Sequence, residues 1–235
     1  MRALIIIPAY NEENNIRNVL ASIKREEPDA DIVVINDGSA DRTGQAAQST
    51  GLATVIDLPV NVGIGGAMQT GYMFAKRGGY EIAVQIDGDG QHDPAELRKI
   101  MTPVIEGKAD CCIGSRFLER TEYRSGLSRR VGIWFFSWMI HWMIGKRFTD
   151  PTSGFRAVNK RIIAQFAEYY PEDYPEVEAI VLLTRQNFRV SEVSVLMHSR
   201  ETGKSSITPI KSLYYMIKVS LAVVITRIRN VSGTR

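Results

Sequence analysis

A cluster of carboxylate and amide side chains follows one short apolar run and is the strongest chemical signal in the sequence. The run at 82–84 precedes a glycine-interrupted stretch of polar residues, namely Asp87, Asp89, Gln91, His92 and Asp93. Carboxylates this close together repel one another unless a cation neutralises them. Oxygen ligands select hard cations such as Mg²⁺ or Mn²⁺, which usually stay bound to substrate phosphates. The cluster therefore predicts a metal site that handles a phosphate-bearing substrate.

The same stretch also allows a purely structural interpretation. Asp-Gly pairs form turns, and Asp93 followed by Pro94 is typical of the cap of a helix that begins near Ala95. Short motifs often match by chance, so the spacing alone leaves both interpretations open.

Two other polar motifs follow apolar runs, at 8–13 and 36–39. In the first, Tyr10 can stack on a nucleobase and Glu12 can accept its N–H groups. In the second, Asp37 can accept from a base or a ribose. The structural alternative is a plain turn at Tyr10 and Glu12, with Asp37 capping the helix that begins after position 41.

Capping and glycine signals accompany these motifs. Asn11 is placed to cap the helix that follows the first strand. The glycines of the stretch 61–66 precede another helix, whose amides can approach a sugar or a phosphate. A lone glycine loop is a weak signal.

The elements that must position these groups alternate regularly through the first half of the chain. The predicted strands are 3–7, 31–35, 54–58, 81–86 and 111–114, and the predicted helices are 12–25, 42–49, 65–77 and 94–106. This alternation indicates βαβ units and a mainly parallel sheet with flanking helices. Ligands of such sheets bind outside the carboxyl ends of the strands, where the polar motifs lie.

Composition sets broad limits. A chain of 235 residues with 44% hydrophobic residues fits one large globular domain, with or without a short appendage, and its net charge of +3 is too weak to indicate a nucleic-acid partner. Cys111 and Cys112 are adjacent, so they point to opposite faces of a strand and are predicted to be core thiols in a reducing compartment. The first apolar run is too short for a signal peptide.

The second half contains an apolar helix with an aromatic face. Trp134, Trp138 and Trp142 recur every four residues between basic pairs at 129–130 and 146–147, so they share one helix face. The run is shorter than the roughly 20 residues needed to span a bilayer. We predict an interfacial membrane helix over 131–145. The alternative is a core helix whose basic ends reach water.

The domain organisation follows from these patterns. Residues 1–206 are predicted to form the catalytic domain, including the helix 131–145. Residues 207–235 are apolar but interrupted by Lys211, Lys218 and Arg227, and are predicted to form an amphipathic membrane-associated segment.

Taken in order, the motifs resemble family 2 glycosyltransferases with the GT-A (Rossmann-like) fold, over nearly the whole chain. The match rests on Pro8-Ala-Tyr-Asn-Glu-Glu13, Asn36-Asp-Gly-Ser39, Asn61-Val-Gly63 and Asp87-Gly-Asp89-Gly-Gln91. The chain departs from the family at Asn36, where Asp is frequent, and keeps Asp37. A narrower resemblance, to polyprenyl-phosphate sugar transferases of the dolichol-phosphate mannosyltransferase type, rests on the stretches 89–94, 114–117, 150–156 and 198–205.

The resemblance implies roles for individual residues. Asp87, Asp89 and Gln91 would hold Mg²⁺ or Mn²⁺ against the diphosphate of a nucleotide sugar, where the metal acts as a Lewis acid. The nucleotide would contact Pro8, Tyr10, Glu12, Asp37 and Asp87. Arg116 and Arg130 would meet an acceptor phosphate, with Arg129 as a competitor for Arg130. Arg200 and Lys204 would belong to a basic loop that closes over the site.

The expected function is inverting transfer of a hexose or N-acetylhexosamine from a UDP-sugar or GDP-mannose to a polyprenyl phosphate, in cell wall polysaccharide biosynthesis. The enzyme would be cytoplasmic and peripheral on the cytoplasmic face of the membrane. A separate small membrane subunit or a homo-oligomer is also considered. A phosphate acceptor is largely ionised at pH 7 and needs positioning rather than a strong base.

Three alternatives stay open. A sugar-hydroxyl acceptor in polysaccharide synthesis would need a carboxylate base, for which Asp150, Glu176 and Glu178 are candidates. A nucleotidyltransferase would leave the nucleotide on the product. A non-catalytic domain would only bind a nucleotide or a membrane, and it would have no need of the acidic cluster.

Overall fold

The computed structural model describes residues 1–119, 127–172 and 175–198. The segment predicted over 207–235 lies outside the described residues. Within these ranges the chain forms an α/β fold built on one seven-stranded sheet.

The sheet is mainly parallel, as predicted. Its strand order is β3-β2-β1-β4-β6-β5-β7. Only β6 runs antiparallel to its neighbours β4 and β5, and the other pairings are parallel. The strands are β1 (Ala3–Ala9), β2 (Asp31–Asn36), β3 (Thr54–Asp57), β4 (Ile82–Gln85), β5 (Cys111–Ser115), β6 (Arg156–Asn159) and β7 (Val190–Ser194). The sequence patterns did not predict β6 and β7.

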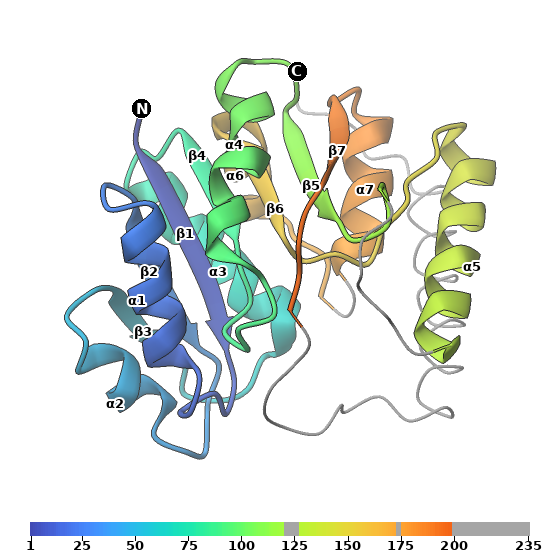
Figure 1. The fold of residues 1–235 in the computed structure, drawn as a ribbon. Helices are drawn as coiled ribbons and strands as arrows, with labels where there is room; N and C mark the ends of the chain where they lie inside the picture. Colours follow the sequence, from blue (N-terminus) through green and yellow to red (C-terminus); the bar gives the residue numbers. More distant parts are fainter. Residues whose placement is uncertain (120–126, 173–174, 199–235) are drawn as a thin grey trace.

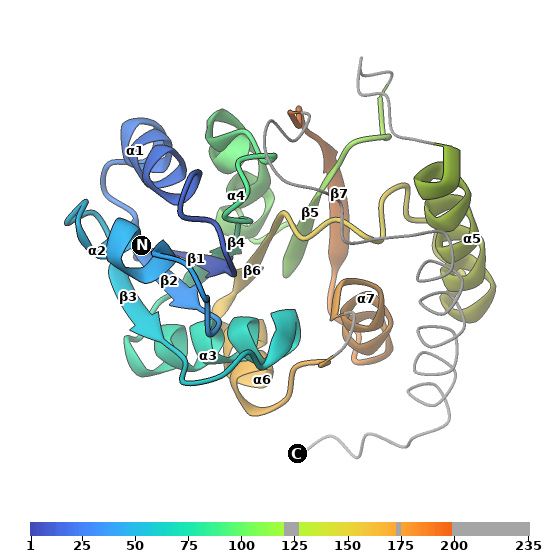
Figure 2. The same cartoon turned by 90° about the horizontal axis from the view of Figure 1, so that it is seen from below.

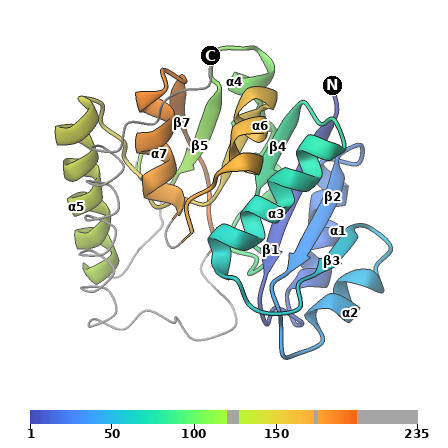
Figure 3. The same cartoon turned by 180° about the vertical axis from the view of Figure 1, so that it is seen from behind.

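Helices cover both faces of this sheet (Figures 1, 2 and 3). One face carries α1 (Ile16–Glu26), α2 (Thr43–Gln48), the 3₁₀ turn η1 (Pro94–Glu96) and α4 (Leu97–Ile105). The other face carries α3 (Gly63–Arg77), α6 (Lys160–Glu168) and α7 (Pro175–Arg185). The helix α5 (Leu127–Ile144) lies beside α7, at the β7 end of the sheet (Figures 2 and 3).

Burial on both faces explains the continuous apolar runs of the central strands. In β1, Leu4 and Ile6 join the core under α3, whereas Ile5 and Ile7 join the core under α1 and α4. Alternation along a strand sends neighbours to opposite faces, so a strand covered on both sides must be apolar throughout. Cys111 and Cys112 follow the same rule: both are buried and free.

The tryptophan helix α5 is amphipathic. Phe136, Met139 and Ile140 are buried in the core. Trp134, Trp138 and Trp142 lie on the opposite face with 69%, 56% and 73% of their surface exposed, so the prediction of a shared face is confirmed. The helix begins at Leu127, earlier than predicted. Among the described helices, none combines the length and apolar character needed to cross a bilayer.

Local capping agrees with the sequence at one position and differs at another. Asp93 accepts a hydrogen bond from the Ala95 amide at 3.0 Å, so the predicted cap is confirmed. The predicted cap at Asn11 is wrong. Asn11 has a φ of 57° and accepts from the Ala40 amide at 2.9 Å, and α1 begins only at Ile16. Asn11 therefore joins two loops instead of starting a helix.

Candidate active site

Parallel pairing collects the polar motifs on one edge of the sheet. The carboxyl ends of β1, β2, β4, β5 and β7 lie at the lower edge in Figure 1, and the antiparallel β6 begins there. The motifs that follow these strands are therefore neighbours in space despite their separation in sequence. This edge is the candidate active site.

The acidic motif after β4 is held by hydrogen bonds within its own loop. The Gln91 amide donates to Asp89 Oδ1 at 3.0 Å, and the Asp87 amide donates to His92 Nδ1 at 3.0 Å. Because Nδ1 accepts, the proton of a neutral His92 lies on Nε2, which is 3.6 Å from Asp87 Oδ2. The ring of His92 is buried and stacks on Phe155, with 4.9 Å between centroids. His92 therefore supports the loop.

The donor set of this loop fits a hard cation that arrives with its substrate. Among the described residues, no three His, Cys, Asp or Glu side chains converge on one point. The loop offers two carboxylates, Asp87 and Asp89, and the side-chain amide of Gln91. All three side chains are partly exposed. Mg²⁺ is typically held by one or two carboxylates together with substrate phosphates, so two are sufficient.

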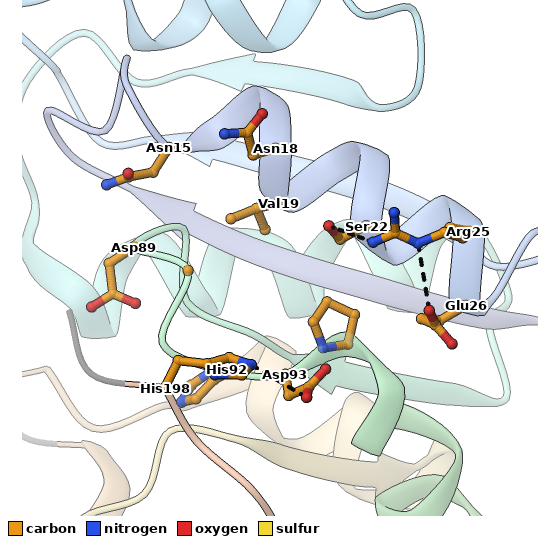
Figure 4. A pocket seen from close by; sticks show the side chains of 12 residues that line it. Asn15, Asn18, Val19, Ser22, Arg25, Glu26, Asp89, His92, Asp93 and His198 are labelled. Atoms are coloured by element: carbon orange, nitrogen blue, oxygen red, sulfur yellow. Dashed lines mark hydrogen bonds and ion pairs between the residues drawn. The ribbon is translucent and has the colours of Figure 1, made fainter. Parts of the chain in front are cut away.

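A polar groove of about 330 Å³ opens beside this loop (Figure 4). Asn15, which precedes α1, and Asn18 and Ser22 of α1 line one side, and Asp89 and His198 lie on the other. The metal motif thus borders open polar space.

The segment after β7 pairs with the acidic motif. Met197 forms a β-bridge with His92, the His198 amide donates to the Gln91 carbonyl at 2.8 Å, and His198 Nε2 lies 3.3 Å from Asp93 Oδ2. Arg200 and Lys204, predicted to form a closing loop, come just after this segment in the sequence and lie outside the described residues.

Asp37 is bound to the start of α3. Asp37 is only 4% exposed, and its carboxylate accepts from the Val62 and Gly63 backbone amides at 2.7 and 3.0 Å. A negative charge is favourable at a helix N-terminus. The predicted alternative named the wrong helix, because the Thr43 amide at the start of α2 donates to Asp41, at 2.9 Å.

The other residues assigned to the nucleotide lie at the neighbouring strand end. Pro8 is buried in β1, opposite Ile35 of β2. Tyr10 is 50% exposed. The Glu12 amide donates to Thr43 Oγ1 at 2.8 Å, and its carboxylate accepts from Asn15 at 2.7 Å. The fold therefore brings Tyr10, Glu12 and Asp37 to adjacent strand ends.

Arg116, at the end of β5, forms a buried ion pair with Asp150. Its Nε and Nη2 donate to Asp150 Oδ2 and Oδ1 at 2.5 and 2.7 Å, and Nη2 also reaches Thr152 Oγ1 at 3.2 Å. Arg116 is 8% exposed and Asp150 is fully buried. Asp150, a candidate base from the sequence, therefore uses both oxygens to hold an arginine.

Glu192 of β7 is a site residue that the sequence patterns missed. Its carboxylate accepts from the Thr149 amide at 2.8 Å and from the Asp150 amide at 2.9 Å. Burial raises the pKa of the Glu192 carboxyl, while these hydrogen bonds favour its charged form. A lone acid inside the strand sequence Val190–Ser194 was the available signal.

The two remaining base candidates, Glu176 and Glu178, lie in the first turn of α7. Burial raises the pKa of the Glu176 carboxyl, and the charge of Arg156 opposes this shift. Glu178 accepts from the Tyr169 hydroxyl at 3.4 Å. The position of Arg130 lies in α5, but its side chain is outside the described part of the chain.

Comparison with known proteins identifies relatives across nearly the whole chain. Glycosyl transferase family 2 matches residues 4–167. A UDP-N-acetylglucosamine–dolichyl-phosphate N-acetylglucosaminyltransferase of Methanococcus voltae is 28% identical over 94% of this chain and 97% of its own length. A polyprenol monophosphomannose synthase of Mycolicibacterium smegmatis is 30% identical over 93% and 86%, respectively.

A solved structure shares the fold. The glucosyl-3-phosphoglycerate synthase of Mycobacterium tuberculosis, in complex with Mn²⁺, UDP and phosphoglyceric acid, superposes with a TM-score of 0.74 at 19% identity. The match covers 96% of this chain and 78% of that one. Together with the family match, this confirms a GT-A-like fold.

The Arg116–Asp150 pair gives a stability prediction. Asp150→Ala leaves a buried guanidinium without its counter-charge and should lower the free energy of unfolding by about 3–5 kcal/mol. The double variant Arg116→Met/Asp150→Leu removes both charges and should lose less. Urea unfolding of the three proteins measures both effects. A single variant that loses less than the double variant would contradict the ion-pair assignment.

Proposed function

This chain belongs to glycosyl transferase family 2, and we propose that it transfers a hexose or N-acetylhexosamine, with inversion, from a nucleotide diphosphate sugar to a polyprenyl phosphate. The observation that carries the proposal is the meeting of the acidic motif and Arg116 on one sheet edge. Relatives named for dolichyl-phosphate and polyprenol substrates support it at about 30% identity.

The donor end of the site is proposed at β1, β2 and β4. Asp87, Asp89 and Gln91 would hold Mg²⁺ or Mn²⁺, which neutralises charge on a departing diphosphate. The solved relative with Mn²⁺ and UDP supports this cofactor class. Tyr10 offers an exposed ring for stacking on the base, and Glu12 and Asp37 are the proposed partners of the polar groups of the base or of the ribose.

The acceptor end is proposed at β5. An ionised phosphate attacks without a strong base, so the protein has to position it and balance its charge. Arg116 has five N–H donors in a planar fork, and we expect the phosphate to share this guanidinium with Asp150. Asp150 then orients an arginine and is a poor candidate for a base. Arg130, Arg200 and Lys204 remain proposed acceptor and loop residues.

One observation favours a second candidate, transfer to a sugar hydroxyl. Burial raises the pKa of Glu176, and the charge of Asp87 adds to this shift. A carboxyl with a raised pKa near a metal motif suits a general base. The arginine-rich acceptor end favours the phosphate.

The membrane surface is the proposed location of the acceptor. Two of the exposed tryptophans of α5, Trp134 and Trp138, border an apolar groove of about 570 Å³, which Phe117 and Phe148 also line. Because Phe117 follows Arg116 directly, a phosphate at Arg116 would leave its prenyl chain near this groove. We propose a peripheral enzyme on the cytoplasmic membrane face. A membrane role for 207–235 and a partner subunit or homo-oligomer stay predictions.

The metal assignment is tested with Asp89→Ala. We expect this variant to lose transfer, because it removes a ligand next to the diphosphate, and a chelator to do the same to the wild type until Mg²⁺ or Mn²⁺ is restored. The assay follows label from UDP-glucose, UDP-N-acetylglucosamine or GDP-mannose into an organic-extractable, acid-labile lipid. Asp29→Ala, which changes an exposed carboxylate elsewhere, is the control. Full activity of Asp89→Ala would refute the assignment.

The acceptor class is tested by a paired comparison on polyprenyl phosphate. Arg116→Lys keeps the charge but loses the planar fork, so it should raise the acceptor KM or lower kcat by about 10–100-fold, the value of one charge-assisted hydrogen bond. Glu176→Gln and Glu178→Gln should stay within a few-fold of the wild type. An inactive glutamine variant beside a nearly normal Arg116→Lys would establish the hydroxyl acceptor instead.

Membrane binding is tested on α5. Lys146 donates to the Val190 carbonyl, so the better candidates for headgroup contacts are Arg129, Arg130 and Arg147. Changing these three to Gln should weaken binding to anionic liposomes by about 100-fold, at about 1 kcal/mol for each arginine. Arg25, Lys99 and Lys108 changed to Gln serve as the control on other surfaces. Equal sedimentation of both triple variants would favour the core-helix interpretation.

A further inference from the structure

We infer that the turn Ser153-Gly154-Phe155-Arg156, which leads into β6, is the support that positions the Asp87 carboxylate for the metal. This inference rests on the metal role proposed above. Three separate contacts carry it, and all three lead to Asp87 or to its neighbour Gln85.

The first contact is a close backbone approach at Gly154. A Cβ atom on Gly154 would lie 2.8 Å from Gln85 Nε2 and 3.3 and 3.5 Å from the two carboxylate oxygens of Asp87. Gly154 does not have a positive φ, so space, and not backbone conformation, requires glycine here. The backbone of the turn therefore forms one wall of the space that the Asp87 carboxylate occupies.

The second contact runs through two rings. Phe155 is buried and stacks on His92 with an interplanar angle of 13°. His92 accepts from the Asp87 amide, and its Nε2 faces the Asp87 carboxylate. A ring that is held by stacking can keep this orientation, as outer residues do for metal ligands. Phe155 thus acts on Asp87 through His92.

The third contact is made by the side chain of Arg156, which holds the turn in place by hydrogen bonds. Arg156 is fully buried, and its Nη2 donates to the Ser153 carbonyl at 2.6 Å while Nη1 donates to the Glu176 carbonyl at 3.3 Å. It pairs in register with Gln85 of β4. The guanidinium therefore ties the turn to the first turn of α7 on one side and to the strand that leads into the metal loop on the other.

The energetics of this corner indicate a role beyond packing. Arg156 is fully buried and its Nε has no hydrogen-bond partner among the described residues, and neither amide atom of Gln85 has one there. Buried polar groups of this kind lower stability, and natural proteins keep them mainly at functional sites. A turn that only started a strand would need neither the buried arginine nor the glycine beside Asp87.

Gly154→Ala tests the inference on the full-length protein. The added methyl group should displace Asp87 and weaken Mn²⁺ binding by about 10-fold or more, the usual effect of disturbing the support of a metal ligand. Binding is measured as the loss of the free Mn²⁺ spectrum in electron paramagnetic resonance, with UDP and separately with GDP present. Gly132→Ala, in α5, is the matched control because no described atom lies within 4 Å of its new methyl group.

A second change separates local displacement from general damage. Gln85→Ala combined with Gly154→Ala removes the 2.8 Å contact and should recover part of the lost affinity. Phe155→Leu keeps an apolar side chain but loses the stack on His92, so it should also weaken Mn²⁺ binding. It carries the test if Gly154→Ala does not fold, as judged by circular dichroism and Tm.

The outcomes are distinct. Wild-type affinity in folded Gly154→Ala, or in Phe155→Leu if that variant carries the test, overturns the inference while the wild type still binds Mn²⁺. Recovery in the double variant means that the methyl group displaces Asp87 through Gln85, whereas no recovery in a folded double variant means that it acts by its direct contacts with the Asp87 carboxylate oxygens. A wild type that binds no Mn²⁺ with either nucleotide overturns the proposed metal role, and this inference with it.

Discussion

The direction of the strands is the constraint on which the candidate site depends. Because β1, β2, β4, β5 and β7 run parallel, the loops that follow them share one edge of the sheet. Covering helices make the rest of each strand a dry, rigid base. Loops on such a base can hold carboxylates and arginines close together without collapsing onto one another.

The single reversed strand adds a feature that parallel strands cannot provide. β6 begins at the edge of the sheet where its neighbours β4 and β5 end. The residues that lead into β6 therefore lie beside the metal loop that follows β4. This places Gly154 and Phe155 against Asp87 and His92, and Asp150 against Arg116. One connecting segment therefore touches both the proposed donor end and the proposed acceptor end.

Buried charges hold the acceptor end in place. Glu192 binds the amides of Thr149 and Asp150, and Asp150 in turn binds Arg116. Each carboxylate accepts hydrogen bonds from the next residue in this series. A fully hydrogen-bonded polar network gives a buried region one defined arrangement. The order of contacts also explains why Asp150 appears acidic and available in sequence but is engaged in the fold.

The sequence by itself determined the α/β class, the polar motifs at the ends of the first strands, the cap at Asp93 and the tryptophan face of α5. These features depend on periods of two and 3.6 residues and on signals between near neighbours, which are contained in the local sequence. The tertiary structure alone decided the reversal of β6, the choice of α3 as the helix that Asp37 caps, the pairing of Arg116 with Asp150 and the support role of Glu192. The contacts of Asp37, Arg116 and Glu192 join positions separated by 25 to 43 residues. Which distant segments meet depends on how the helices and strands pack together, and no local pattern records that choice.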